Sequence, residues 1–588
     1  MSQTTIFRNN LSPPILKISS RFRINVFSIA VLLGLGLLVY SHTCRYPFEF
    51  DDYSNIVANT TIRNLANLKA IWSFWPTRFV TYLSLALNYH FGKLDVFGYH
   101  VFNIIIHLSA ALLVRWFILL IFSTPVIKKS ALNDDAYFIS FFASIIFVCH
   151  PIQTQAVTYI IQRASSLAAF FYMASLCFYL KSRILQFKGE SDAVWTIYYI
   201  GSLVSGIFSM FTKEFAITLP FAIFLCEHCF FKDKKPIELK YAAAFMVMFL
   251  VIPFTMLITR SIALPGMHLV WDKPLGISPF RYLLTQFRAI ITYLRLFVMP
   301  FNQSIIYDYP LAEGLFQPRI ILSLFFLSAL FYIAKRLFLK YRIISFSIFW
   351  FFLTILPESS IIPIKDVIFE HRMYLPMVGF CLFLSSALYY LLGRQSRLPA
   401  IMMLSCLIFM YAGLAYARNL VWRDELVLWD DAVTASSKAT AYEYRGTVFL
   451  IRGFYDKAIS DYTNAMQKEP DYSNLYNKRG VAYYKKGLYE QAILDYDKAI
   501  KLDPDYIEAY YNRAALYFSK GDFKMAFSDY DKAIEMAPSR AEGYYNRGLA
   551  YFFKKDYHRS YSDMRKAQLL GYKIAPAIME KLLKEKTK

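Results

Sequence analysis

The sequence lacks the short motifs that mark most ATP-dependent enzymes and the commonest hydrolases. No glycine-rich loop is followed by Lys and then Ser or Thr, so we expect no ATP-driven chemistry in this chain. Neither Gly-x-Ser-x-Gly nor His-Glu-x-x-His occurs, which disfavours a serine hydrolase and a zinc protease. Any chemistry must therefore use a substrate that is already activated, and we favour a lipid-linked donor supplied outside the cytoplasm.

Cysteine is also scarce, with 7 residues in a chain of 588. Most of them lie inside apolar runs, so they do not form a disulfide framework. Cys226-Glu-His-Cys229 is a single Cys-x-x-Cys without a second ligand pair, and we predict no metal site from it. The sequence therefore requires no cofactor, although paired acids elsewhere could hold a divalent cation.

Apolar and aromatic side chains are abundant: 57% of the residues are hydrophobic, and the chain contains 54 Phe and 45 Tyr. The apolar residues form runs long enough to cross a bilayer, which predicts a polytopic membrane protein. The net charge is +22, yet residues 439–588 hold 26 Lys and Arg against 20 Asp and Glu. Most of the excess thus lies in the membrane half, where cytoplasmic anchoring and phosphate binding are expected rather than nucleic-acid contact.

Apolar runs and Lys/Arg clusters predict about 11 spans, with the N-terminus in the cytoplasm. We place them near residues 24–42, 100–122, 136–152, between Arg163 and Lys181, and near 194–211, 214–230, 241–260, 318–334, 343–357, 373–391 and 399–416. Residues 280–299 are instead predicted as an interfacial or re-entrant helix, because Arg281, Arg288 and Arg295 recur on one stripe. If this helix crossed the bilayer, the basic cluster at 335–342 would lie outside, against the positive-inside tendency. The C-terminal region is then expected outside the cytoplasm.

A 34-residue period runs four times through the C-terminal region. The repeats cover 439–472, 473–506, 507–540 and 541–574, and a small residue recurs at Gly446, Gly480, Ala514 and Gly548. The pattern resembles tetratricopeptide repeats, in which helix-turn-helix units stack into a solenoid. The expected fold class is therefore all-α, with a polytopic membrane domain at 24–417 followed by four repeats at 439–574. The flanking segments are predicted as a cytoplasmic N-terminus at 1–23, a linker helix at 418–438 and a basic tail or capping helix at 575–588.

Each repeat also carries an Arg before its small residue and an Asp sixteen positions after that Arg. These pairs are Arg445 and Asp461, Arg479 and Asp495, Arg513 and Asp529, and Arg547 and Asp563. We interpret each pair as a bond between the two helices of one repeat rather than as a ligand site. The concave positions predict an aromatic groove of near-neutral charge, which suits an extended polypeptide or sugar rings. Its residues are Asn477, Tyr484, Tyr511, Phe518, Tyr545 and Phe552.

Two adjacent acids, Asp51 and Asp52, directly follow the first apolar run. A carboxylate at the bilayer centre costs about 2.5–3.5 kcal/mol, so acids beside a span usually lie in a water-filled cavity or at its mouth. The alternative is a solvated loop or a helix N-cap, because Asp caps helices well. Other charged residues are predicted on the same outer surface, where charges also anchor helices in lipid headgroups. Taken together, these residues favour a functional site.

The chemistry of these side chains suits group transfer from a phosphate. An acceptor hydroxyl is a poor nucleophile and needs a carboxylate to take its proton, which makes Asp51 or Asp52 the candidate base. A departing phosphate gathers negative charge, which Arg and Lys stabilise best. The candidate phosphate-binding residues are Arg78, Arg163, Lys213 and Arg372, with His371 as a hydrogen-bond donor and with Arg288 and Arg295 reaching in from the interfacial helix. Glu214, Glu370 and His150 are expected to support the site.

Several short motifs occur in a fixed order along the chain. They are Phe50-Asp-Asp-Tyr53, Arg78 with Asn88-Tyr89, Gly98-Tyr-His100 with His107, His150-Pro151 with Arg163, Lys213-Glu214, and Glu370-His-Arg372 with Pro376. Together with the repeats, they resemble the transmembrane and tetratricopeptide-repeat O-mannosyltransferase family and its bacterial relatives, which belong to the GT-C class. The resemblance covers nearly the whole chain. It implies an inverting transfer of a sugar from a polyprenyl- or dolichyl-phosphate donor to a hydroxyl on the extracytoplasmic side, with Asp51 or Asp52 at the position of the base.

The chain departs from that family at two positions. Gln155 stands where the mannosyltransferases carry Glu, and Ser165 stands where they carry an acid after Arg-Ala. Donor identity and metal dependence therefore stay open. The resemblance implies a polyprenyl-phosphate-linked sugar, a protein or peptide acceptor in the groove, and the lipid bilayer as partners, and no nucleic acid. We favour a bacterial inner membrane over the endoplasmic reticulum, with the repeats outside the cytoplasm.

Two other functions fit part of this pattern. A non-catalytic scaffold could recruit partners through the repeats, but about 11 spans with polar clusters on one side exceed what an anchor needs. A transporter or flippase of lipid-linked saccharide would share the phosphate-binding cations. It also predicts charged residues at mid-membrane depth with access from both sides, whereas the charges here are predicted at one surface.

Overall fold

The computed structural model describes residues 20–130, 132–231, 239–262, 277–364, 366–393 and 395–586, which form helices and loops and no β-strand. The predicted all-α fold class is thereby confirmed. The chain divides into a first unit of Met1–Gln303 and Pro310–Arg423 and a second unit of Ser304–Tyr309 and Asp424–Lys588. Of the predicted cytoplasmic N-terminus, residues 1–19 lie outside the described residues, as do the last two residues of the predicted tail.

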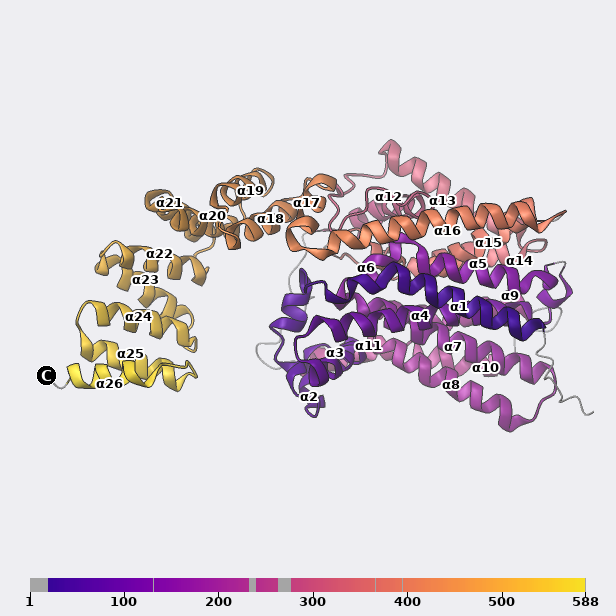
Figure 1. Ribbon diagram of the computed structural model, residues 1–588, viewed down its shortest axis with the longest axis horizontal. Coiled ribbons are helices and arrows are strands. Elements are labelled where there is room, and N and C mark those ends of the chain that lie inside the picture. Colours follow the sequence, from indigo (N-terminus) through magenta and orange to yellow (C-terminus); the bar gives the residue numbers. More distant parts are fainter. Residues whose placement is uncertain are drawn as a thin grey trace, which may run out of the picture. The chain divides into compact units, whose positions relative to one another are not determined.

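The first unit is built from apolar helices (Figure 1). They are α1 (Ser20–Tyr40), α4 (Val96–Phe122), α5 (Ala136–Cys149), α7 (Arg163–Phe187), α8 (Asp192–Met210), α9 (Leu219–Phe230), α10 (Leu239–Met248), α11 (Val251–Ile262), α12 (Pro279–Val298), α13 (Pro318–Leu337), α14 (Arg342–Ile355), α15 (Pro376–Leu392) and α16 (Arg397–Leu420). Each predicted span falls on one of these helices, with α10 and α11 sharing one.

Among the described residues, 6 helices are long and apolar enough to cross a membrane. A seventh span results if Ala136–Cys149 and Pro151–Val157, which are bent by 53°, count as one. Three shorter apolar helices, Ala243–Ile258, Arg342–Ile355 and Pro376–Leu392, belong to the same unit. These lengths and compositions support a multi-pass membrane unit.

The predicted interfacial segment forms α12, which is not among the six long candidate spans. Its three Arg side chains donate to backbone carbonyls of the following loop: Arg281 to Ala312, Arg288 to Pro310 and Arg295 to Phe301. The three Arg residues that suggested an interfacial helix therefore hold the loop after α12 against α12.

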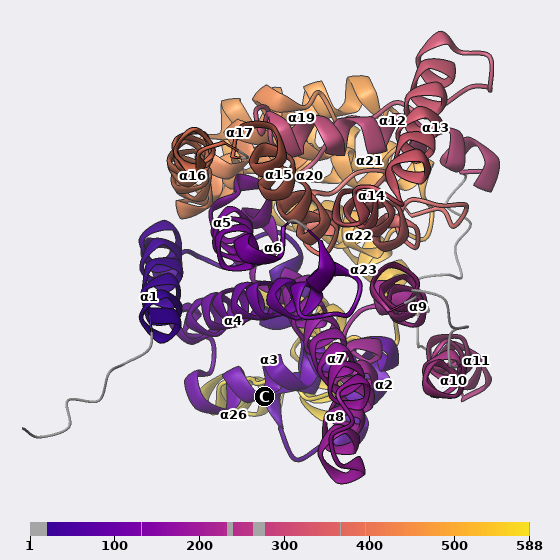
Figure 2. The same ribbon diagram turned by 90° about the vertical axis from the view of Figure 1, so that its right-hand side faces the viewer.

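Small residues let the long helices approach closely. Ser175 of α7 and Ser202 of α8 each donate from the hydroxyl to the other's backbone carbonyl, at 2.8 and 2.7 Å. Ser209 donates to the carbonyl of Ala168 at 2.9 Å. Hydroxyl-to-carbonyl bonds between helices suit a membrane interior, where an unpaired polar group finds no water. The end-on view in Figure 2 shows α7 and α8 side by side.

Several short elements connect the helices at one end of the first unit, where Figure 1 shows α2, α3 and α6. They are α2 (Leu68–Phe74), α3 (Phe79–Gly92), α6 (Thr154–Val157) and the single turns Tyr53–Val57, Pro76–Arg78, Glu214–Thr218 and Glu370–Met373. The start of α3 is fixed to the turn after α8, because Val80 N–H donates to the carbonyl of Phe211 and the Thr81 hydroxyl donates to that of Thr212, both at 2.9 Å. Arg78, Glu214 and Glu370–Arg372 lie in these turns, and Asp51, Asp52 and Lys213 directly precede two of them.

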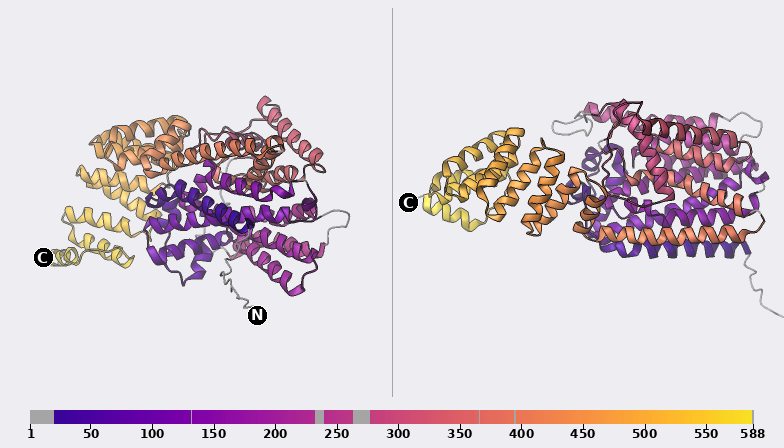
Figure 3. Two further views of the ribbon diagram at one scale, coloured as in Figure 1. Left: turned by 45° about the vertical axis from the view of Figure 1, so that its right-hand side comes forward. Right: turned by 90° about the horizontal axis from the view of Figure 1, so that it is seen from above.

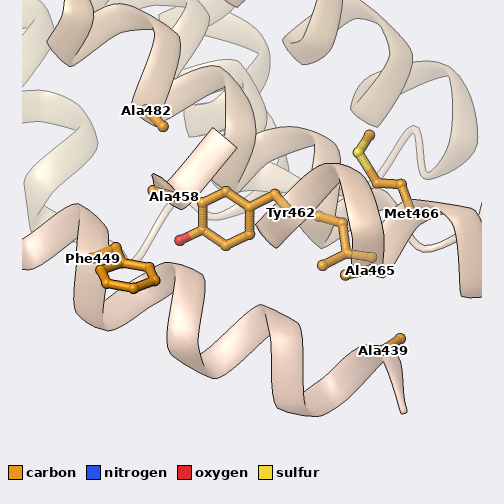
Figure 4. Close-up of a cluster of buried hydrophobic side chains, with 8 residues drawn as sticks. Ala439, Phe449, Ala458, Tyr462, Ala465, Met466 and Ala482 are labelled. Atoms are coloured by element: carbon orange, nitrogen blue, oxygen red, sulfur yellow. The ribbon is translucent and has the colours of Figure 1, made fainter. Parts of the chain in front are cut away.

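The second unit is a row of antiparallel helix pairs (Figure 3). Its helices are α17 (Glu425–Ala435), α18 (Ala439–Ile451), α19 (Tyr455–Lys468), α20 (Ser473–Lys486), α21 (Tyr489–Leu502), α22 (Ile507–Ser519), α23 (Phe523–Met536), α24 (Ala541–Phe553), α25 (Tyr557–Leu569) and α26 (Pro576–Lys586). Tyr462 packs with Phe449, Ala458 and Met466 in the first pair (Figure 4). The recurring small residue makes room for this packing, since a Cβ on Gly446 would lie 3.0 Å from the Tyr462 ring.

The predicted Arg–Asp bond is present in all four repeats. In each, the guanidinium donates to both carboxylate oxygens of the Asp at 2.7–2.8 Å. The interpretation as a bond between the two helices of a repeat is confirmed. A two-point contact of this kind fixes the angle between the helices as well as their separation.

Candidate active site

The acidic loop, which we define as Phe48–Tyr53, begins the site. Asp52 is buried, and its carboxylate accepts hydrogen bonds from the backbone N–H of Glu49 at 3.1 Å and of Ile161 at 2.8 Å. Burial raises the pKa of Asp52 to about 7, and the adjacent charge of Asp51 acts in the same direction. Asp52 thereby ties the acidic loop to the segment that precedes α7.

Asp51 has a different environment, because it is exposed to solvent. Its backbone N–H donates to the hydroxyl of the buried Tyr159 at 2.8 Å, and its carbonyl accepts from the Asn55 amide at 2.8 Å. The preceding Phe50 has a φ of 48°, a left-handed conformation that is uncommon for a bulky residue. The loop is therefore held by its backbone, and Asp51 is exposed to solvent beside the buried Tyr159 hydroxyl.

A pair of charges between Arg78 and Glu214 lies beside the start of α3. Arg78 donates from Nε and Nη2 to the Glu214 carboxylate at 3.0–3.2 Å, and the Thr77 hydroxyl donates to the same group at 2.9 Å. Burial acts to raise the pKa of Glu214, but the Arg78 charge outweighs it and holds that pKa below the ordinary value. Arg78 also stacks on Trp75, with the guanidinium carbon 4.3 Å from the ring centre.

Lys213 has a partner that the sequence reasoning missed. Its ammonium group lies 3.0 Å from the Glu358 carboxylate and donates to the Ser165 hydroxyl at 2.9 Å. Burial lowers the pKa of Lys213, and the Glu358 charge opposes that shift. Glu358 directly follows the predicted span 343–357, which runs outward. The sequence could therefore have placed Glu358 on the same outer surface as Lys213. Ser165 is one of the two positions where the chain departs from the family it resembles.

The segment Glu370–Arg372 contributes three buried side chains. Glu370 accepts from the Gln303 amide at 2.7 Å. His371 contacts Gln155, the second departing position, through both its backbone N–H and Nδ1. Arg372 donates to the backbone carbonyls of Val367 and Asp366 at 2.9 and 2.7 Å and forms no ion pair with a carboxylate within the described ranges.

These groups converge in space. Burial lowers the pKa of His371 well below its ordinary value, and the positive charges of Lys213, Arg372 and Arg78 add to that effect. Three cations therefore lie within electrostatic reach of one imidazole. Burial raises the pKa of Tyr82. The charge of Arg78 opposes that shift, and the charges of Glu214 and Asp51 add to it. The Tyr82 hydroxyl donates to Asn55, which in turn donates to Asp51, so the acidic loop and the cations share one region.

Two further predicted residues form hydrogen bonds inside the first unit. Arg163 is fully buried and donates to the side chains of Asn103 and Asn88 and to the carbonyl of Tyr99, at 2.5–2.9 Å. Its guanidinium is thus engaged with α3 and α4. His150 accepts from the backbone N–H of Ile152 and contacts the carbonyl of Phe297, so it joins the end of α5 to α12.

The predicted groove residues lie within the second unit. Asn477 is buried, and its side chain bonds to Tyr506 at 3.2 Å and to Asn512 at 2.8 Å. The five aromatic residues are half-buried and pack against the hydrophobic clusters between the helices: Tyr484, Tyr511, Phe518, Tyr545 and Phe552. Their rings therefore contribute to the packing of the solenoid as well as to its surface.

Within the described ranges, no three His, Cys, Asp or Glu side chains gather where they could hold a metal ion. The positive charge at this site comes from Arg and Lys side chains.

Tetratricopeptide-repeat models match the second unit. Models described as TPR repeat match residues 446–487 and 482–521, and models described as Tetratricopeptide repeat match 507–540 and 541–570. Among solved structures, a MamA crystal structure is 23% identical with a TM-score of 0.23, over 25% of this chain and 85% of that one. The crystal structure of YrrB, described as a TPR protein with an unusual peptide-binding site, is 21% identical with a TM-score of 0.24, over 35% of this chain and 98% of that one.

Curated relatives extend the likeness into the membrane unit. A protein O-mannosyl-transferase of Caenorhabditis elegans is 25% identical over 474 residues, which is 76% of this chain and 63% of that protein. One from Drosophila melanogaster is 25% identical over 76% of this chain and 56% of the relative, and a human one is 24% identical over 76% and 52%. The chain thus spans between half and two thirds of the length of these relatives. The resemblance predicted from its motifs is confirmed.

Proposed function

We propose, from this relationship and from the convergence of acids and cations in the first unit, that the chain is an integral-membrane glycosyltransferase. It transfers a hexose, with mannose as the first candidate, from a polyprenyl-phosphate donor to a hydroxyl of a protein. The reaction takes place on the extracytoplasmic side of the membrane. The observation that carries the proposal is that Tyr82 bonds to Asn55, which bonds to Asp51, and stacks on Trp75, which carries Arg78; this supports one site for the base and the cations.

Asp51 is the better candidate for the base. An acceptor hydroxyl must come within hydrogen-bond distance of the carboxylate that takes its proton, which requires a carboxylate that the acceptor can reach from solvent. Asp51 is exposed, whereas both oxygens of Asp52 accept from backbone N–H groups in a buried position. Asp52 is then a positioning residue that fixes the loop on which Asp51 is displayed.

Arg372 is the leading candidate for the phosphate. Arg78 and Lys213 each contact a carboxylate, which offsets their charge. Arg372 donates to backbone carbonyls, which orient the guanidinium, while the Glu358 and Asp366 carboxylates act on it only from a greater distance. A phosphodiester supplies acceptor oxygens to this guanidinium, which within the described ranges forms no ion pair, and a planar guanidinium binds two phosphate oxygens at once.

The proposed step is a single displacement. The acceptor oxygen attacks the anomeric carbon and its proton passes to the Asp51 carboxylate. The bond from that carbon to the phosphate oxygen breaks, and the lipid phosphate leaves with the bonding electrons. Its charge is stabilised by Arg372, supported by Lys213 and Arg78. The repeats are proposed to present the protein acceptor, because the inner face of such solenoids is their usual binding surface.

A reconstitution separates this function from its alternatives. Full-length protein in liposomes is incubated with tritium-labelled dolichyl-phosphate mannose, with and without an extract of membrane proteins from the native host. Transfer of label to protein, or release of free mannose without acceptor, supports the glycosyltransferase. Movement of intact donor between leaflets without either reaction indicates a flippase, and no change in the donor indicates a scaffold. Removing residues 439–588 should abolish labelling of protein and spare release of free mannose; unchanged labelling would contradict the role given to the repeats.

A further inference from the structure

His371 and Gln155 form a contact that fixes the hydrogen positions of both side chains. Gln155 Oε1 lies 2.8 Å from the backbone nitrogen of His371 and 3.2 Å from its Nδ1. A backbone N–H can only donate, so the Gln155 atom that it meets must be the amide oxygen. The reversed amide would direct its own N–H bonds at that donor.

The same oxygen then determines the tautomer of His371. An amide oxygen accepts and never donates, so Nδ1 must carry the hydrogen that points at it. The imidazole is neutral, because it is buried beside the three cations Arg78, Lys213 and Arg372, which disfavour a further positive charge. A neutral imidazole carries one hydrogen, so Nε2 has a lone pair and no hydrogen. Within the described ranges, Nε2 has no hydrogen-bond partner.

This arrangement changes the role expected for His371. A lipid phosphodiester offers only acceptor oxygens, and a lone pair on Nε2 repels them. A hydroxyl offers a hydrogen, which the lone pair accepts. The amide nitrogen of Gln155 is buried without a partner among the described residues, which adds a donor on the same pair of side chains. A donor and an acceptor held together suit the hydroxyl groups of a sugar.

We propose that His371 is a specificity residue, which accepts a hydrogen bond from one hydroxyl of the bound sugar through Nε2 and is held in that tautomer by Gln155. The inference rests on the proposed function, since it says that His371 contacts the sugar of the donor. The phosphate is left to Arg372 and the neighbouring cations.

The tautomer is measured directly, without any substrate. The 9 His residues of the full-length protein are labelled with nitrogen-15, and the His371 signals are assigned by their loss in His371→Asn. One protonated nitrogen at Nδ1 and one bare nitrogen at Nε2, at about pH 7 and still at about pH 5, support the inference. Hydrogen on Nε2, or a doubly protonated ring at about pH 7, overturns it.

The sugar contact is tested with dolichyl-phosphate mannose and its 2-, 3-, 4- and 6-deoxy counterparts. For the wild type, we expect one deoxy donor to lose about tenfold in kcat/KM, the usual weight of one hydrogen bond. His371→Asn keeps a side-chain N–H for Gln155 but removes Nε2, and it should process the parent and that deoxy donor equally. His371→Gln places an oxygen near the position of Nε2 and should restore part of the preference.

The outcomes separate the two proposals. Turnover by the wild type with an unchanged deoxy preference in His371→Asn overturns the inference and leaves the function standing. No turnover of any mannosyl donor contradicts the proposed mannosyl transfer, and the nitrogen-15 spectrum then decides the state of His371 by itself.

Discussion

Asp52 accepts a hydrogen bond from the backbone N–H of Ile161 at 2.8 Å, across 109 positions of the sequence. This bond joins the acidic loop to the segment before α7 and buries Asp52, while the adjacent Asp51 stays exposed. Two acids that look equivalent in the sequence therefore have different environments, and we propose separate roles for them. Asp52 holds the loop, and Asp51 is the proposed base.

Substitution of the two acids should separate these roles. Asp51→Asn removes the proposed base and should lower kcat by about 10²–10⁴-fold with an unchanged melting temperature. Asp52→Asn leaves one buried backbone N–H facing an amide NH₂ group, which should lower the free energy of unfolding by about 1–3 kcal/mol. Initial rates and thermal unfolding in detergent measure both effects. Asp134→Asn, an exposed acid at the opposite end of α5, is the matched control and should change neither. Equal loss of rate in Asp51→Asn and Asp134→Asn would contradict the assignment of the base.

The stability of the chain should depend on pH through Asp52. Burial raises its pKa from 3.8 to about 7, so between these values the folded chain keeps a proton that the unfolded chain releases. Stability therefore falls as the pH rises through this window and is level above it. Asp52→Asn lacks the ionisable group and should lack this slope. Melting curves of both proteins between about pH 4 and about pH 8 check the sign, and parallel curves would show that Asp52 ionises normally.

Lys213 and Glu358 should behave as a coupled pair. Either Lys213→Met or Glu358→Gln leaves one buried charge without its partner, which typically costs about 3–5 kcal/mol. The double variant removes both charges and should recover much of this stability. Its activity should stay low, because a cation near the phosphate is missing. A double-mutant cycle of unfolding free energies measures the coupling, and additive losses would refute the pairing.

The small residue of each repeat should be sensitive to added volume in a fixed order. A Cβ on Gly480 would lie 2.7 Å from the Tyr496 ring, whereas the nearest atoms to a Cβ on Gly446 and Gly548 are at 3.0 and 3.2 Å. Replacement by Ala should therefore destabilise the solenoid most at Gly480, by about 1–3 kcal/mol. Gly413→Ala in α16 is the control, since its Cβ would meet nothing within 4 Å. Melting temperatures of the four variants from circular dichroism give the order of destabilisation. A Gly480→Ala protein as stable as the control would show that the Tyr496 ring moves aside without a measurable cost.

Much of the fold follows from local patterns in the sequence. Apolar runs of bilayer length locate the helices of the first unit, and the 34-residue period locates the repeats together with their Arg–Asp bonds. Both signals are periodic and repeat many times, so a single sequence suffices to read them. The acidic loop and the charged connections stood out because charges beside apolar runs are costly.

Pairings between distant connections could not be read in this way. Lys213 and Glu358 lie 145 positions apart, and no local pattern marks an acid after one span as the partner of a cation after another. Arg163 is a predicted phosphate ligand because it begins a helix among other charges, and its bonds to Asn103 and Asn88 could not be read from the sequence. The difference between Asp51 and Asp52 likewise depends on Ile161, which only the tertiary structure brings to the loop.

The central claim is that the acidic loop and the repeats face the same compartment outside the cytoplasm, so that a lipid-borne sugar can pass to a protein held by the repeats. Single cysteines test it most directly. In a chain whose 7 native cysteines are replaced, Ser54→Cys marks the acidic end of the first unit, Ser519→Cys marks the repeats, and Ser123→Cys marks the opposite end of α4; all three positions are exposed. In intact cells or sealed vesicles treated with a membrane-impermeant maleimide, the account predicts that Ser54→Cys and Ser519→Cys label from the same side and that Ser123→Cys labels only from the other. Labelling of Ser54→Cys and Ser519→Cys from opposite sides would contradict it.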